Sequence, residues 1–207
     1  MQTVLTLLLV LVLLVALGLA IALLVGALRR RKTVQGLRER ATTVDPMAAG
    51  PLVSDPRRIK AGDVVVIEEV EYLVRGTLAM DEDGYRWKEH LLDASGIDGD
   101  VRRWLSVEEG ESGIEVVLWD RVSGADLTPV TELTLDGVTY RRDEQGEARF
   151  ASTGTTGAAT DGTMSYADYL QPGGKGLLSL ERFAAGGSWE VSTGRPLTLE
   201  SLTVLHS

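Results

Sequence analysis

The chain has 207 residues, 44% of them hydrophobic, and a formal net charge of −9. All charged residues lie after position 28 and the first 28 positions are almost entirely apolar, which excludes both a simple soluble protein and a membrane protein with several spans. The absence of cysteine excludes a disulfide framework and thiolate chemistry.

Residues 4–28 contain no charge and are dominated by leucine and valine. A helix of this length measures about 37 Å, enough to cross a bilayer core of roughly 30 Å. A basic cluster, residues 29–32, follows directly, and by the positive-inside rule it should stay on the cytoplasmic side. The sequence therefore predicts a single-pass transmembrane helix in the cell membrane, with the remainder of the chain in the cytoplasm. A cleaved signal peptide is the alternative, but a basic segment before the apolar run is missing and the run is too long.

Residues 29–58 are predicted to be a basic collar and a flexible linker. Positions 29–40 hold six Arg or Lys against one Glu, whereas positions 41–207 hold fifteen against twenty-nine Asp or Glu. The collar suits an anionic membrane surface, and the linker contains Pro46 and Pro51, which break a helix. The balance of −14 in the remaining chain argues against nucleic acid as a partner, because such binding needs basic patches.

Residues 59–207 are predicted to form a β-rich domain, because apolar residues alternate with polar ones and the runs recur between Gly-rich turns. The dipeptide Asp136-Gly137 between two alternating runs predicts a hairpin. A short helical turn is an alternative within 161–170, and 152–162 is expected to be a mobile loop that buries nothing. The fold class is mainly β, a barrel or a sandwich. The expected strands are Val64–Ile67, Val70–Met80, Tyr85–Leu91, Arg103–Glu108, Ile114–Val122, Leu133–Leu135, Val138–Tyr140, Arg149–Ala151, Leu177–Phe183, Trp189–Ser192 and Leu202–Leu205.

The second half of this domain repeats features of the first. Trp87–Leu91 parallels Tyr166–Leu170, and Leu105–Glu108 parallels Leu178–Glu181. Further matches are Val70-Glu71-Tyr72 with Val138-Thr139-Tyr140 and Ile114-Glu115-Val116 with Trp189-Glu190-Val191. The order is kept while the gaps differ, which predicts two related β-units. The matched aromatic and acidic residues either pack in the core or line a shared binding groove, whose candidate residues are Trp87, Glu89, Tyr166, Asp168 and Trp189.

Several short motifs occur in a fixed order over roughly 59–205. They are Ile59–Asp63, Tyr72–Gly76, Trp87–Leu92, Trp104–Glu108, Tyr166–Tyr169, Leu178–Arg182 and Trp189–Val191. These motifs resemble a bacterial family of domains of unknown function, the family numbered 4178. The resemblance implies a β-rich domain that is often membrane-tethered, with genes associated with membrane-stress or polyamine-related modules, and it brings no established catalytic residue.

Recognisable catalytic and metal-binding patterns are missing. The two histidines, His90 and His206, have no second ligand four residues away. Ser106 and Ser179 do not lie on a nucleophile elbow, and the Gly-rich stretches lack phosphate-loop spacing. We therefore expect no metal, no cofactor and no enzymatic activity.

Two functions remain open at the level of sequence. The first is a non-catalytic protein-interaction module that binds a partner at the membrane, favoured by the predicted anchor, the linker and the acidic charge. The second is a sensor for a small ligand, a polyamine or another cation, for which carboxylates and tryptophans would supply charge pairing and cation–π contacts.

Overall fold

The computed structural model describes residues 55–93, 102–110 and 113–206. They form a mainly β structure, as predicted. The predicted transmembrane helix at 4–28 and residues 29–54 of the predicted collar and linker lie outside the described residues. Within the described ranges, no helix has the length and apolar character needed to cross a membrane.

The described chain consists of eleven strands and two short 3-10 helices. The 3-10 helices are η1 (Pro56–Arg58) and η2 (Leu199–Ser201). The strands are β1 (Val64–Ile67), β2 (Val70–Glu82), β3 (Tyr85–Asp93), β4 (Arg103–Gly110), β5 (Gly113–Arg121), β6 (Glu132–Leu135), β7 (Val138–Gly154), β8 (Asp161–Leu170), β9 (Leu177–Arg182), β10 (Glu190–Leu197) and β11 (Leu202–Leu205).

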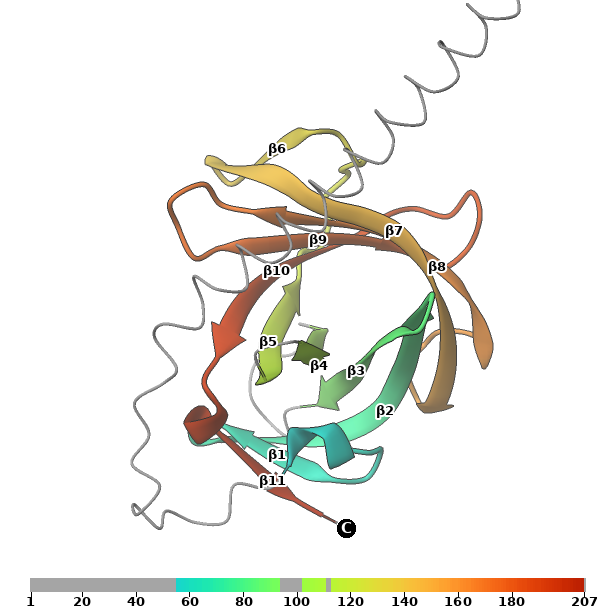
Figure 1. Ribbon diagram of the computed structural model, residues 1–207, viewed down its shortest axis with the longest axis vertical. Coiled ribbons are helices and arrows are strands. Elements are labelled where there is room, and N and C mark those ends of the chain that lie inside the picture. Colours follow the sequence, from blue (N-terminus) through green and yellow to red (C-terminus); the bar gives the residue numbers. More distant parts are fainter. Residues whose placement is uncertain (1–54, 94–101, 111–112, 207) are drawn as a thin grey trace, which may run out of the picture. The chain divides into compact units, whose positions relative to one another are not determined.

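The sheet closes into an antiparallel barrel. Its strand order is β11-β1-β2-β3-β4-β5-β10-β9-β8-β7-β6, and an additional pairing of β2 with β7 closes the ring from β2 round to β7. Figure 1 shows this ring, with β1 and β11 on one side of it and β6 on the opposite side. Closure removes the open edges of the eight ring strands, and only β11 and β6 remain as ends of the sheet.

Tight two-residue turns connect neighbouring strands. The predicted hairpin at Asp136-Gly137 is confirmed, with φ of 50° and 78°, as its turn type requires. Asp83-Gly84 turns the chain in the same way between β2 and β3. A third such turn, Glu68-Glu69 between β1 and β2, was not predicted, because two glutamates carry no turn signal.

Three local predictions are wrong. The two runs expected at 138–140 and 149–151 belong to one continuous strand, β7, of 17 residues. Residues 161–170 form β8 rather than a helical turn. Residues 155–160 do form a loop between β7 and β8, but the expectation that this segment buries nothing is wrong, because Thr156 is 3% exposed. The Thr156 and Ser152 hydroxyl oxygens lie 2.7 Å apart in a hydrogen bond.

Three hydrophobic cores pack against the barrel wall. The first contains side chains from β1 to β5 and β11, the second contains side chains from β6 to β10, and both lie on the outer face. The third lies on the inner face and contains Leu78, Met80, Ala148, Phe150, Met164 and Tyr166. In β4 and β9 the core residues are Leu105 and Val107, and Leu178 and Leu180. Because side chains alternate along a strand, the residues between them point to the opposite, inner face.

The two halves have matching registers. In β3 and β4, Glu89 pairs with Ser106, and in β8 and β9, Asp168 pairs with Ser179. The hairpins β1–β2 and β6–β7 also correspond, since Val65 pairs with Tyr72 and Leu133 with Tyr140. Even the bulges match: the register shifts at Arg75 and at Asp143, 68 positions apart like Tyr72 and Tyr140. The structure thus places the matched residues at equivalent positions of two five-stranded units.

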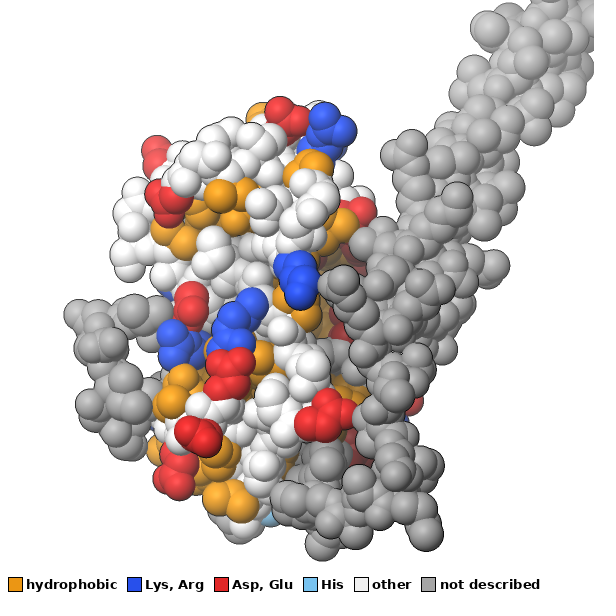
Figure 2. Space-filling model, turned by 90° about the vertical axis from the view of Figure 1, so that its left-hand side faces the viewer, with side chains coloured by type: hydrophobic (Ala, Val, Ile, Leu, Met, Phe, Trp, Pro, Cys, Tyr) orange, Lys and Arg blue, Asp and Glu red, His pale blue; other side chains and the backbone are white. Residues whose placement is uncertain are grey.

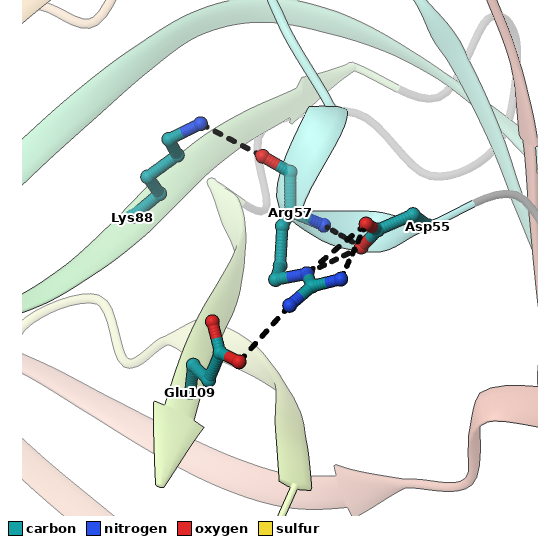
Figure 3. A network of polar contacts seen from close by, with 4 residues as sticks. All are labelled: Asp55, Arg57, Lys88 and Glu109. Atoms are coloured by element: carbon teal, nitrogen blue, oxygen red, sulfur yellow. Dashed lines mark hydrogen bonds and ion pairs between the residues drawn. The ribbon is translucent and has the colours of Figure 1, made fainter.

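The described chain begins with η1, within the segment that the sequence assigned to the linker. The Arg57 guanidinium lies between Asp55 and Glu109 of β4, with Nη1 to Oε1 of Glu109 at 3.0 Å (Figure 3). Lys88 of β3 donates to the Arg57 carbonyl oxygen at 2.8 Å. Asp55 to Arg58 are therefore held against the barrel wall by polar contacts.

Candidate functional site

The inner face of the barrel carries many acidic side chains. The register fixes which residues share this face, because residues directly opposite in paired strands point the same way. Trp87 pairs with Glu108, and Glu108 pairs with Glu115; on the other side, Tyr166 pairs with Glu181, and Glu181 with Glu190. The inner-facing carboxylates are Glu82, Glu89, Glu108, Glu115, Glu144, Asp168, Glu181 and Glu190.

These carboxylates interact across the barrel. The charge on Glu89 of β3 acts on Glu181 of β9, and Asp168 of β8 acts on Glu108 of β4, although neither pair of strands is adjacent in the sheet. Interaction between strands on opposite walls requires that the side chains point into the ring. We call the set Glu89, Glu108, Asp168 and Glu181 the acidic cluster.

Burial and mutual repulsion disfavour the charged forms of the cluster. Burial raises the pKa of Glu89 to about 7, against the opposing effect of the Trp87 hydrogen bond. Burial first, and neighbouring carboxylates second, raise the pKa of Glu108 to about 7. The pKa of Asp168 is also raised to about 7, chiefly by burial, and that of Glu181 is raised for the same reasons.

The two equivalent acids, Glu89 and Asp168, each have a hydrogen-bond partner in the wall. Trp87 Nε1 donates to Glu89 Oε1 at 2.9 Å, and Ser179 bonds to Asp168. Each carboxylate has further lone pairs. Glu89 is 7% exposed and Asp168 is half-buried, so these acceptors lie mostly within the protein.

Tyr166 lies between two further inner carboxylates. Its hydroxyl lies 2.6 Å from Glu82 Oε2 and 2.5 Å from Glu144 Oε1. A single hydroxyl proton can be donated to only one of them at a time, so the other oxygen faces the hydroxyl lone pairs. Gly146 makes this approach possible, because a Cβ there would overlap with Glu82 and Tyr166.

Few cations lie on the inner face of the ring. By register, Arg121 and Arg141 are the two Arg or Lys residues at inner-facing positions of the eight ring strands. Arg121 pairs with Glu190, and the exposed Arg141, opposite Leu170 near the start of β7, pairs with Glu132. On the outside the charges are mixed: Figure 2 shows basic side chains beside acidic ones on one side of the molecule. The inner face is therefore far more acidic than the outer surface.

Aromatic rings complete the inner wall. Trp87, Trp104 and Trp119 are half-buried on this face, and the Trp87 ring meets Tyr166 edge-on, with centroids 6.0 Å apart. Trp119 Nε1 donates to Ser106 Oγ at 3.0 Å. Gly194 lies opposite Trp119, where a Cβ would overlap with the indole ring.

The structure brings together four of the five residues predicted to line a groove. Trp87, Glu89, Tyr166 and Asp168 all point to the inner face. Trp189 does not: it packs beside the second core on the outer face, with Arg182 Cζ 4.6 Å above its ring. Sequence reasoning missed Glu108 and Glu181 as site residues, although the repeat Leu-Ser-x-Glu already placed both on the same strand face as Ser106 and Ser179.

Comparison with known proteins identifies the family. The family described as domain of unknown function DUF4178 matches residues 60–199. The chain belongs to this family. Among curated proteins, it is 36% identical to the uncharacterised protein Mb2628 of Mycobacterium bovis and to the uncharacterised proteins MT2673 and Rv2597 of Mycobacterium tuberculosis, each over 190 residues that cover 89% of both chains. No solved structure matches the chain.

The DUF4178 domain offers no metal centre in the described part of the chain, where no group of three or more His, Asp or Glu is arranged to hold a metal ion. His90 is fully buried and its Nδ1 lies 2.9 Å from the Thr77 hydroxyl. His206 Nδ1 lies 3.0 Å from Asp63 Oδ2. Both histidines therefore have structural neighbours outside the barrel interior.

Proposed function

We propose that this DUF4178 protein is a membrane-tethered domain that binds a small organic cation, a linear polyamine or a related amine, at the inner face of its barrel. The observation that carries the proposal is the acidic cluster, which β3 and β4 on one wall and β8 and β9 on the opposite wall direct into a closed ring. This is the second of the two functions that the sequence left open. The protein-interaction module is a separate proposal, on which the barrel interior does not bear.

Enclosed carboxylates need either protons or a counter-cation. Separating several like charges from water without a partner is strongly unfavourable, so a ligand that brings positive charge gains more energy here than at the surface. Ammonium groups donate up to three hydrogen bonds each, which suits the free lone pairs of Glu89 and Asp168. The inner-facing rings of Trp87, Trp104 and Trp119 would add cation–π contacts.

Membrane tethering is proposed from the sequence. The apolar segment 4–28 and the basic collar support it. The alignment with the mycobacterial proteins covers more residues than the described domain contains, so those relatives share part of the segment before Asp55. Protease treatment of inverted membrane vesicles should digest the C-terminal domain, and a protected domain would contradict the cytoplasmic orientation.

Calorimetric titration of the full-length chain in detergent with spermidine tests the ligand proposal. We expect saturable heat at pH 8. Glu89→Gln should weaken binding at least about tenfold, since loss of 1.4 kcal/mol of interaction has that effect. Glu147→Gln is the matched control, because Glu147 is exposed and points outward from β7. No heat with millimolar spermidine, or equal losses in both variants, would overturn the proposal.

A further inference from the structure

The two halves differ in how their first strand is covered. In the first unit, Val64 and Val66 of β1 pair with Leu205 and Thr203 of β11. The equivalent positions in the second unit, 68 residues later, are Glu132 and Thr134 of β6. Among the described residues no strand pairs with the outer edge of β6, which is the last strand in the sheet order. The position that β11 fills in one unit is open in the other.

The hairpin geometry points backbone groups of β6 toward this open edge. Leu135 and Val138 flank the two-residue turn and therefore exchange hydrogen bonds. Since hydrogen-bonded and non-bonded pairs alternate in an antiparallel ladder, the N–H and C=O groups of Glu132 and Thr134 point away from β7. Both residues are exposed, so the edge is accessible for pairing with another strand.

The second core is less well covered than the first. In the first unit, Leu202 and Val204 of β11 close the core beside β1, and Val65 and Ile67 are 0% and 1% exposed. Their equivalents beside the open edge are more exposed: Leu133 is 8% exposed and Leu135 is half-buried. A strand in the place of β11 would bury the apolar edge that remains.

We infer that the outer edge of β6 is a docking site for an extended segment of a partner protein, which adds to the sheet as β11 adds to β1. Its pairing is antiparallel, with one apolar residue opposite Leu133 and a second, two positions away, opposite Leu135, as Val204 and Leu202 stand opposite Val65 and Ile67. Backbone bonds give the affinity and the two apolar side chains give the specificity.

Charge favours a basic segment of another protein over a second copy of this chain. Positions 41–207 hold fifteen Arg or Lys against twenty-nine Asp or Glu, so two copies repel each other, whereas a basic segment is attracted. Glu132 and Asp136 are exposed at the edge itself. The inference goes beyond the proposed cation binding, since β6 lies outside the ring.

A peptide that imitates β11 tests the inference. The probe is the sequence Ser201–Leu205 with a lysine added at each end, fluorescently labelled and titrated into the full-length chain in detergent. We expect saturable binding, and weaker binding of the same peptide with glutamate at each end. Amide hydrogen exchange should slow at Glu132 and Thr134 when the probe binds. No binding at millimolar probe, or no protection at these two amides, would overturn the inference.

Two variants at one position separate edge pairing from other binding. Thr134→Pro removes an N–H that points away from β7 and leaves the hairpin bonds intact, and proline is tolerated on edge strands. It should weaken probe binding at least about tenfold, because a backbone bond is lost and the ring of proline blocks the approach. Thr134→Val keeps the N–H and should bind normally. Equal binding of the probe by both variants would overturn the inference. So would a dimer of the full-length chain that sedimentation detects and that Thr134→Pro dissociates, because the segment at the edge of β6 would then come from a second copy.

Discussion

Glu89 is an inner residue whose buried carboxylate charge lowers the stability of the folded protein and would attract a cationic ligand. Its carboxylate is 7% exposed and accepts a hydrogen bond from Trp87, and burial raises its pKa to about 7. Above that pH the chain holds a buried charge beside other carboxylates. Functional sites commonly carry such locally unfavourable groups.

Glu89→Gln should therefore stabilise the ligand-free protein at pH 8. The amide keeps an oxygen acceptor for Trp87 Nε1 and removes the buried charge, so we expect about 1–3 kcal/mol of added stability. Thermal unfolding of the full-length chain without amines measures this. At pH 5 the gain should shrink, because Glu89 itself is then protonated. The exposed Glu71, changed to Gln, should have little effect at either pH, and a Glu89→Gln protein less stable than the wild type at pH 8 would contradict the argument.

Gly146 controls how closely Tyr166 approaches the wall. A Cβ at this position would overlap with Glu82 and Tyr166, so Gly146→Ala should displace the Tyr166 ring and cost about 1–3 kcal/mol of stability. Gly110→Ala is the control, since the nearest atom to its Cβ would be Glu115 Oε1 at an ordinary 3.6 Å. Chemical denaturation monitored by tryptophan fluorescence compares the free energies of unfolding of the two variants. Equal values would show that Glu82 and Tyr166 move aside without a loss of stability.

At the scale of elements, β11 acts as a cover for the first core. Leu202 and Val204 are each 3% exposed, whereas Leu205 in the same strand is 51% exposed. Leu202→Ala should lower the free energy of unfolding by about 2–5 kcal/mol, as buried leucines do. Leu205→Ala should change it by less than about 0.5 kcal/mol. Similar losses in urea denaturation would mean that β11 is not firmly packed.

Individual strands and their faces were largely predictable from sequence, whereas ring closure was not. Alternation located β1 to β5 and the Asp136-Gly137 hairpin, and the repeat placed Trp87 and Tyr166 on equivalent strands. Nothing in a period of two tells which face of a strand points inward; that depends on the pairing of β2 with β7, between residues more than 65 positions apart. The wrong placement of Trp189 was avoidable, because its match to Ile114 in the repeat already put it on the face opposite to that of Glu190.

Strand length was underestimated for a related physical reason. In β7 the residues from Arg141 to Glu147 are nearly all polar, so they carry no alternating apolar signal. They form a strand because β8 pairs with them and because Glu144 and Gly146 face an acidic interior. Because these inner positions are polar, alternation of apolar residues detected neither the middle of β7 nor Glu144 as part of the inner face.

Across the described molecule, unlike charges are paired on the outer surface, whereas the charged groups of the inner face are mostly carboxylates, with the Arg121–Glu190 pair among them. Outer pairs such as Asp81–Arg86 lower the pKa of the aspartate through a hydrogen bond from the arginine, so they lose their small contribution only in acid. The inner cluster has raised pKa values. The two groups act on stability in opposite pH ranges.

The ligand-free protein should therefore be most stable near pH 5 and lose stability as the pH rises to 8. Carboxylates with folded pKa values of about 7, against ordinary values of 3.8 and 4.5, favour the folded state when protonated, and this contribution is lost as the pH rises through 7. Raising one carboxyl pKa from 4.5 to about 7 corresponds to about 3 kcal/mol. A domain of this size changes by ~2–4 °C per kcal/mol, so we expect Tm to fall by roughly 6–12 °C.

Spermidine should reverse this pH effect, because a bound ammonium favours the ionised carboxylates. Binding then raises Tm strongly at pH 8 and weakly at pH 5, where protons occupy the same oxygens. Calorimetry in buffers of different ionisation enthalpy should show proton release on binding near pH 7. Potassium at matched ionic strength is the control, since screening alone acts weakly on enclosed charges. Equal stabilisation by spermidine at both pH values, with no proton release, would place its binding on the outer surface instead of on the acidic cluster.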